Sequence, residues 1–271
     1  MGLFDIFEMA LANAGHLADQ CAGHAAVVVE FAQIVEKDGR LSVTMRLDRL
    51  RDFLGGGHFL NPWEECYRDA GGDPKAAEQL MADRQKEWYG RRALFEGSFD
   101  GGKLFRYGAL YTRGRGLIDS RYGPFCSVFR ADAADAWKRV AWLPANSLKR
   151  YVPDDRTFNV ERLRGEVGAH GARHQVAAIK HAEDVAVRPQ DEWPTLLCQG
   201  DRFVEGIVAE DLVPAAVERL LVDTAFWSVL QDAADAVLDG DAVTPQTQAD
   251  AGRFAEIRAA LKKWDLQEEM V

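Results

Sequence analysis

The chain has 271 residues, of which 47% are hydrophobic, and it carries seven Trp and fourteen Phe. This composition excludes a disordered chain, and the length is sufficient to bury a sizeable core. The formal net charge of −10 argues against broad binding to nucleic acid or to an anionic membrane surface. The four cysteines lie far apart with no C-x-x-C pair, which favours isolated thiols in a reducing cytoplasm over a disulfide framework or a zinc site.

The N-terminal segment MGLFDIFEMALANAG has acidic residues where a signal peptide has basic ones, and no apolar run reaches membrane length. We therefore expect a cytoplasmic protein that does not span or coat a membrane. An effector exported by a specialised secretion machine would show the same features, so export remains an alternative.

The first ninety residues are predicted to be mainly helical. Apolar residues recur at helical spacing over 3–37, and 41–54 is predicted to be a strand followed by a helix. Pro62 and Pro74 each follow an Asn or Asp that can cap a helix, so we expect helices to begin at both prolines.

The central stretch has a different pattern, with short β-rich runs. The runs 105–111 and 121–129 each contain Arg-Tyr-Gly followed by strand-forming residues, and 112–120 between them is predicted to be a loop. Arg offers planar donors suited to phosphate, and glycine lets a ligand approach the backbone closely. The two runs would then form one wall of a site for a phosphate-bearing ligand. The alternative is a β-hairpin whose Arg and Tyr side chains simply lie along its ends.

The later segments predict more strands and then helices. Strands are expected at 137–142, 146–152 (as a continuation or edge of the sheet) and 176–179, and a hairpin at 195–199 and 202–208. Helices are expected at 214–221, 226–238 and 254–266, with a polar linker at 239–248. The predicted fold class is α+β, with a helical N-terminal region (1–90), a β-rich core (91–226) and C-terminal helices (227–271).

Glu205 is the main candidate for chemistry. In a strand over 202–208, alternation places Phe203, Glu205 and Ile207 on one face. A carboxylate between two apolar residues points toward an apolar or cleft surface, which is unfavourable unless it has a partner or a function. The alternative is a solvent-facing glutamate on an edge strand.

Several segments in order resemble a bacterial family of unassigned function. The segments are Arg84 and Trp88, then LFEGSFD (94–100), YGAL (107–110) and RYG (121–123), which are similar to the family pattern W-E, LFGGxYD, YGAL and RFG or RYG. A later segment from Val204 to Phe226 is similar to the family pattern VEAQVHGxVDLxxDVExLVxDPSF. The resemblance covers about Arg84 to Phe226. The family is grouped with the ADP-ribosyltransferase-like fold, so the resemblance implies such a fold for the central β region.

The same resemblance implies that NAD is bound as a substrate and that Glu205 is the catalytic residue. In ADP-ribosyltransferases a strand glutamate binds the nicotinamide ribose and stabilises the oxocarbenium-like transition state, because a fixed negative charge lies beside developing positive charge. The acceptor would be an unidentified protein or nucleic acid, and the chain would be a toxin or phage-defence effector.

The other candidates for NAD binding lie in the two Arg-Tyr-Gly runs. Arg106 and Arg121 are candidates for the diphosphate, Tyr107 and Tyr122 for stacking on a ring, and Ser127 for the ribose or an arginine. For Ser127 the alternative is a strand residue satisfied by backbone groups.

Two positions depart from the family pattern. Ile207 stands where the pattern Glu-x-Gln has its second polar residue, and Pro124 stands where RFG is followed by Ser. These departures motivate an alternative, in which the chain is an inactive interaction module that binds a protein partner through its terminal helices.

A third interpretation is a metal-dependent hydrolase that uses His170, His174 and His181. The first two have the i, i+4 spacing of a helical metal pair, but Gly168 and Gly171 disfavour a helix there and no third ligand is fixed by spacing. We therefore expect no metal site.

Overall fold

The computed structural model describes residues 3–118, 121–137, 139–154 and 156–271. The helices of its first hundred residues are α1 (Ile6–Ala12), α2 (Ala14–Ala22), α3 (Ala26–Asp38), α4 (Leu47–Gly56), α5 (Pro62–Asp69), α6 (Pro74–Gln85) and α7 (Tyr89–Gly97). The later helices are α8 (Ala131–Ala136), α9 (Ser147–Tyr151), α10 (Val160–Glu166), α11 (Arg173–Val187), α12 (Trp193–Leu196), α13 (Thr224–Leu238) and α14 (Pro245–Trp264). Short 3₁₀ turns are η1 (Lys86–Trp88), η2 (Gly102–Leu104), η3 (His170–Ala172), η4 (Gln190–Glu192), η5 (Gly200–Arg202) and η6 (Pro214–Ala216).

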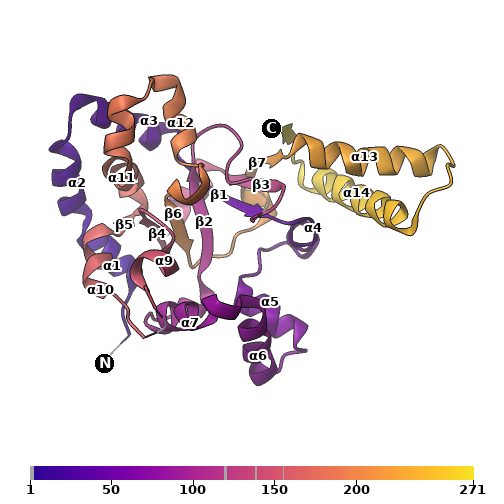
Figure 1. Cartoon of the computed structure of the whole chain (residues 1–271), viewed down its shortest axis with the longest axis horizontal. Helices are drawn as coiled ribbons and strands as arrows, with labels where there is room; N and C mark the ends of the chain where they lie inside the picture. The colour runs from indigo at the N-terminus through magenta and orange to yellow at the C-terminus, as the bar shows by residue number, and fades with distance from the viewer. Residues whose placement is uncertain (1–2, 119–120, 138, 155) are drawn as a thin grey trace.

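A single eight-stranded sheet organises these helices, which confirms a mixed α and β fold (Figure 1). Its strands are β1 (Arg40–Met45), β2 (Arg106–Tyr111), β3 (Phe125–Phe129), β4 (Val140–Leu143), β5 (Gly168–Ala169), β6 (Glu205–Val208), β7 (Val217–Val222) and β8 (Glu268–Met270). Their order is β5-β4-β6-β2-β1-β3-β7-β8, and every neighbouring pair is antiparallel except β7 with β8. The sheet therefore includes a strand from the N-terminal region and one from the extreme C-terminal segment.

The two faces of the sheet are covered differently. One face carries the largest core, in which residues of α3, α4 and α11 pack against the strands. The other face is covered by α1, α7, α9 and α10 at its β4–β6 end. Over the middle of that second face lie the segment after β2 and the segment before β6, where Leu117 and Phe203 pack on Ala109. Helices α13 and α14 form a hairpin that extends away from the rest of the chain (Figure 1).

Several sequence predictions are confirmed by these elements. The strand and helix predicted over 41–54 are β1 and α4, and the helices predicted after Asn61 and Asp73 are α5 and α6. Asn61 forms a complete capping box with Glu64, and Asp73 accepts hydrogen bonds from the Lys75 and Ala76 amides. No helix in the described ranges has both the length and the apolar character needed to cross a membrane.

The alternative interpretation of the two Arg-Tyr-Gly runs, a β-hairpin, is wrong. The runs do form β2 and β3, but β1 lies between them and pairs with both. β1 precedes both runs by about 60 residues or more, and the local sequence of the runs does not indicate that a strand from so far away pairs with them. The loop predicted at 112–120 is irregular through 118, and positions 119–120 lie outside the described residues.

The secondary structure predicted for four short segments is wrong. Residues 146–152 form helix α9 rather than sheet, 176–179 lie in helix α11, and 195–199 are helix and turn rather than half of a hairpin. Conversely, 214–221 is a 3₁₀ turn followed by strand β7 rather than a helix. Runs of four to eight apolar residues fit a buried strand and a buried helix equally well, so tertiary packing decides between them.

Candidate functional site

Small side chains on adjacent strands leave room for a cavity on the second face of the sheet. Ser42 of β1 lies opposite Ala109 of β2, and Ala109 lies opposite Glu205 of β6. Residues directly opposite one another project from the same face, so these three form a row across the sheet. A cavity of about 220 Å³ lies over this row, and Glu205 belongs to its lining.

Aromatic side chains form much of the cavity wall. Tyr122 and Phe203 meet edge to face, with 6.3 Å between ring centroids and 82° between their planes. Tyr107 lies on the same strand face as Ala109, and the Arg92 guanidinium lies 5.0 Å from the centre of its ring. The cavity therefore offers ring surfaces to a flat ligand beside a carboxylate.

Glu205 is held inside the protein rather than at the surface. It is only 4% exposed, and β6 is an interior strand between β4 and β2, so the alternative of a solvent-facing edge-strand glutamate is wrong. The backbone amide of Ser147 donates a 2.8 Å hydrogen bond to its Oε2 atom. Burial raises the pKa of Glu205 from 4.5 to about 7, although Ser147, Arg92 and Lys180 act in the opposite direction.

A second buried carboxylate, Glu96, organises the same end of the cavity. It is 2% exposed and accepts hydrogen bonds from Trp63 Nε1 (2.5 Å), Tyr107 OH (2.7 Å) and Arg92 Nη1 (2.6 Å). Both carboxylate oxygens of Glu96 thus accept hydrogen bonds. Burial and the Glu96 charge raise the pKa of Tyr107 well above its ordinary value, so this phenol stays protonated and continues to donate. Glu96 therefore fixes Tyr107 and Arg92 in the cavity wall.

A larger groove of about 670 Å³ adjoins the cavity. Thr44, Arg49, Pro62 and Tyr122 line both spaces. The groove walls contain the arginines 46, 49, 68, 84 and 121 and the acids 48, 52, 65 and 69.

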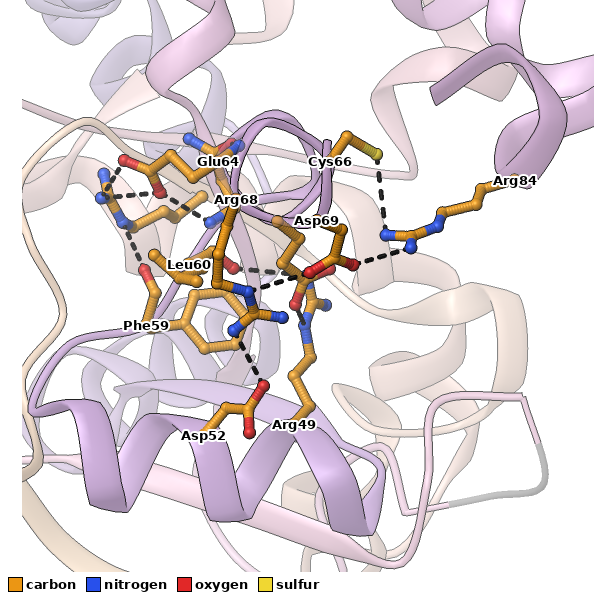
Figure 2. A network of polar contacts seen from close by, with 12 residues as sticks. Arg49, Asp52, Phe59, Leu60, Glu64, Cys66, Arg68, Asp69 and Arg84 are labelled. Carbon is orange, nitrogen blue, oxygen red and sulfur yellow. Dashed lines mark hydrogen bonds and ion pairs between the residues drawn. The ribbon is translucent and has the colours of Figure 1, made fainter. Parts of the chain in front are cut away.

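Most of the groove arginines are engaged with these acids. Figure 2 shows Arg68 between Asp69 and Asp52, and Arg84 bound to Asp69 and to the Cys66 sulfur. Arg46, in contrast, is exposed and makes no ion pair with any residue in the described part of the chain. It is therefore available to an anionic group in the groove.

The structure brings four of the six candidate residues to this site. Glu205, Tyr107 and Tyr122 line the cavity, and Arg121 lines the groove beside it. The Arg121 guanidinium lies over the Tyr122 ring at 5.2 Å and donates to Asp201 at 3.1 Å.

Arg106 and Ser127 lie on the other face of the sheet, outside the cavity lining. Arg106 is 2% exposed and bonds to Glu64, to Asp211 at 2.7 Å and to the Phe59 carbonyl. Ser127 is 1% exposed and lies opposite Val43, whose side chain belongs to the large core. Strand alternation explains both positions, because neighbouring residues of a strand point to opposite faces. Tyr107 and Cys126 point to the cavity face, so the adjacent Arg106 and Ser127 point to the other face.

The glycine of the second Arg-Tyr-Gly run has a structural role. Gly123 has φ of +121°, and a Cβ atom there would lie 2.3 Å from the Met45 carbonyl oxygen. The position thus needs glycine because β1 passes close by. The expected function of this glycine, which was to admit a ligand to the backbone, has no support here.

The three histidines are not gathered into one site. His170 accepts a hydrogen bond from Trp142 Nε1 at 3.3 Å, and the His181 ring lies 3.5 Å from Asp184. His170 lies in the 3₁₀ turn η3 and His174 in the first turn of α11, so the two histidines do not lie on one continuous α-helix. The described residues contain no group of three or more His, Cys, Asp or Glu side chains placed to hold a metal ion.

The sequence analysis did not identify Arg49, Arg92, Glu96 and Ser147 as site residues. Arg49 bonds to Glu65 at 2.6 Å and lies at the junction of cavity and groove, and Arg92 lies between Tyr107 and Glu96. Asn146 was the available signal for Ser147, since Asn before a short polar run is a helix cap rather than a strand residue. Nothing in the local sequence marks Arg49 or Arg92.

Comparison of the chain with protein-family models, with curated protein sequences and with solved structures finds no match in any of the three. The site is therefore interpreted from its own geometry.

Proposed function

We propose that the Glu205 cavity binds the nicotinamide ribose end of NAD and that the protein transfers ADP-ribose to a macromolecular acceptor. The observation that carries this proposal is a buried carboxylate, Glu205, facing a cavity walled by aromatic rings. A cation with a flat ring suits such a site, because the carboxylate attracts its charge and the rings take up its faces. The resemblance to the ADP-ribosyltransferase-like group points to the same ligand.

The proposed ligand extends from the cavity into the groove. A cavity of about 220 Å³ has room for a ring and a sugar. It does not hold a whole dinucleotide, since sites for drug-sized ligands occupy roughly 300–1,000 Å³. The diphosphate and adenosine would then lie in the adjoining groove, where Arg46, Arg49 and Arg121 provide donors.

The proposed chemistry breaks the bond between the ribose C1 atom and the nicotinamide nitrogen. The bonding electron pair leaves with the nitrogen, so nicotinamide departs neutral and the ribose carries the positive charge. Ionised Glu205 stabilises this charge as it develops. A lone pair of the acceptor forms the new bond to C1, and the acceptor proton passes to a base. A carboxylate with a pKa of about 7 can itself be that base.

Ile207 does not take part in this scheme. It lies on the same strand face as Glu205, but it is fully buried in the core that includes Ala141 and Leu143. Orientation of the acceptor would have to come from other residues near Glu205, of which Asn146 and Ser147 line the cavity. This arrangement supports an acceptor-binding surface that differs from the Glu-x-Gln pattern.

A calorimetric comparison of NAD with NADH tests the binding step. The nicotinamide ring is cationic in NAD and neutral in NADH, so only NAD favours ionised Glu205. We expect NAD affinity to rise about tenfold from pH 6 to pH 8, as a carboxyl with a pKa near 7 ionises. NADH should bind with little pH dependence, and Glu205→Gln should remove the dependence for NAD.

Nicotinamide release in a cell extract tests the catalytic step. Glu205→Gln should lower the rate by about two to three orders of magnitude, the effect of deleting one preorganised electrostatic group. Glu183→Gln is the matched control, because Glu183 is exposed on α11, and it should leave the rate unchanged. Equal rates for wild type and Glu205→Gln would refute the role of Glu205. Absence of both NAD binding and turnover would favour an inactive interaction module instead.

A further inference from the structure

A second cavity, of about 440 Å³, lies between the end of β4 and the start of β6. It is lined by residues of α2, α9, α10 and α11, by Pro144 and Ala145 after β4, and by η5 before β6. None of the residues that line it also lines the Glu205 cavity. It is therefore a separate space, to which the proposed function assigns no ligand.

The lining of this cavity combines two kinds of side chain. Leu17, Val176 and Ile179, from α2 and α11, are apolar. The charged lining residues are three cations, Arg150, Lys180 and Arg202, and two acids, Glu166 and Asp201. A ligand that matches both kinds of lining has an apolar body and one charged group.

The positive charges of these three side chains are neutralised by nearby acids to different degrees. Arg150 forms a two-pronged ion pair with Glu166, at 2.5 and 2.7 Å, and Arg202 pairs with Asp184 at 2.9 Å. Lys180 instead donates to a neutral group, the backbone carbonyl of Phe203, at 2.6 Å.

The surroundings of Lys180 leave its positive charge poorly balanced. Burial lowers the pKa of Lys180 to about 8, with the neighbouring Arg150 and Arg202 acting in the same direction and Glu205 and Asp184 against it. An added negative charge at this point would relieve that imbalance.

We infer that this cavity is a binding site for a small organic monoanion, with an apolar body against Leu17, Val176 and Ile179 and a carboxylate on Lys180. Lys180 has three N–H donors and uses one of them on the Phe203 carbonyl, so two remain for a carboxylate. The neutral Phe203 carbonyl need not be displaced for the anion to bind.

The site shares two chain segments with the Glu205 cavity. Phe203, whose carbonyl Lys180 holds, precedes Glu205 by two residues, and Ala145 precedes Ser147 by two residues. The binding claim itself stands without NAD, so it is tested on the protein alone. Failure of the NAD proposal would leave its outcome unaffected.

Benzoate and benzamide are the probes, because they share a flat apolar body and differ in charge. Titrations of the full-length protein, followed by calorimetry and ligand-observed NMR, should show benzoate binding at least about tenfold more tightly than benzamide, as expected for one charge-assisted hydrogen bond. Equal binding of the two, or no binding of benzoate, would overturn the inference.

Three variants locate the site. Lys180→Met keeps the side-chain length without the charge and should weaken benzoate binding about tenfold or more, whereas Lys75→Met, on the exposed surface of α6, should leave it unchanged. Ile179→Trp places a bulky ring in the apolar part of the lining and should abolish binding while Lys180 remains. Circular dichroism first establishes that each variant is folded. If folded Lys180→Met and Ile179→Trp both bind benzoate as wild type does, the ligand lies elsewhere and the inference fails.

Discussion

Arg106 and Arg121 each begin a copy of the Arg-Tyr-Gly motif, but one is buried and the other is exposed. Arg106 is 2% exposed and satisfied by carboxylates and carbonyls, whereas the Arg121 side chain is 46% exposed beside the groove. Both begin an Arg-Tyr-Gly run, so the motif itself does not distinguish them. Arg106 has a structural role because it lies on the face of strand β2 that points away from the cavity.

We predict that Arg106→Met lowers stability and leaves NAD affinity within about threefold of wild type. The variant removes the hydrogen bonds from Arg106 to Glu64, to Asp211 and to the Phe59 carbonyl, which should cost about 2–3 kcal/mol in the free energy of unfolding. Glu64 and Asp211 are partly exposed, so water can hydrate their carboxylates when Arg106 is removed. The loss of stability is therefore smaller than for breaking a fully buried ion pair.

Arg121→Met is the matched control for Arg106→Met. Its side chain is exposed, so its removal should change stability by less than about 1 kcal/mol. Urea unfolding gives the stabilities and calorimetry gives the affinities. A wild-type stability for Arg106→Met combined with lost NAD binding would restore Arg106 as a ligand-binding residue.

At the scale of elements, helix α5 connects the groove to the cavity. Trp63 donates to Glu96, Glu64 pairs with Arg106, and Glu65 pairs with Arg49. All three follow the Asn61 cap, whose side chain accepts from the Trp63 and Glu64 amides and donates to the Lys103 carbonyl at 3.0 Å. The first turn of α5 therefore holds the wall of the site in place.

We predict that Asn61→Ala destabilises the protein by about 1–2 kcal/mol, as loss of an N-cap does, and also weakens ligand binding in the cavity. Asp73→Ala on α6 is the matched control. Asp73 makes the same kind of cap but is exposed, so it should cost about 1 kcal/mol or less and spare binding. Thermal unfolding and NAD calorimetry measure both effects. Equal effects of the two substitutions on binding would contradict a special role for α5.

At the scale of the whole molecule, the buried Glu205 and the partly buried Glu166 change the free energy of unfolding in opposite directions as the pH rises. The folded-state pKa of Glu205 is raised to about 7, so its contribution is fully present below the unfolded value of 4.5 and is lost as the pH rises through 7. Burial raises the pKa of Glu166, but hydrogen bonds from Arg150 and Tyr151 outweigh it and the net pKa is lowered. The contribution of Glu166 is present above 4.5 and is lost as the pH falls below it.

We predict that Glu205→Gln removes the alkaline loss. At pH 8 the variant should be more stable than wild type by about 3 kcal/mol, since each unit of pKa shift corresponds to about 1.4 kcal/mol. At about pH 4 the two proteins should unfold nearly alike, because folded Glu205 is protonated and most unfolded chains are protonated at this position as well. Melting curves from pH 4 to pH 9 measure the difference. A variant less stable than wild type at pH 8 would show that Glu205 is instead half of a stabilising ion pair.

The sequence by itself determined the local features of this protein. Asn61 and Asp73 mark the starts of α5 and α6, because a cap and the following proline are recognisable within four residues. Alternation over 203–207 predicted that Glu205 shares a strand face with Phe203 and Ile207, but it left open whether that face is buried or exposed to solvent. The caps and this orientation depend only on neighbours in the chain.

The tertiary structure decided which strands are neighbours and hence what the site contains. β1 enters between β2 and β3, which places Ser42 and Thr44 in the cavity and leaves Ser127 outside it. Arg49 and Arg92 come from helices that the local sequence does not connect to Glu205. Strand pairing and helix packing bring together residues that are far apart in the chain. The interactions that stabilise these contacts therefore cannot be recognised from any short segment of the sequence.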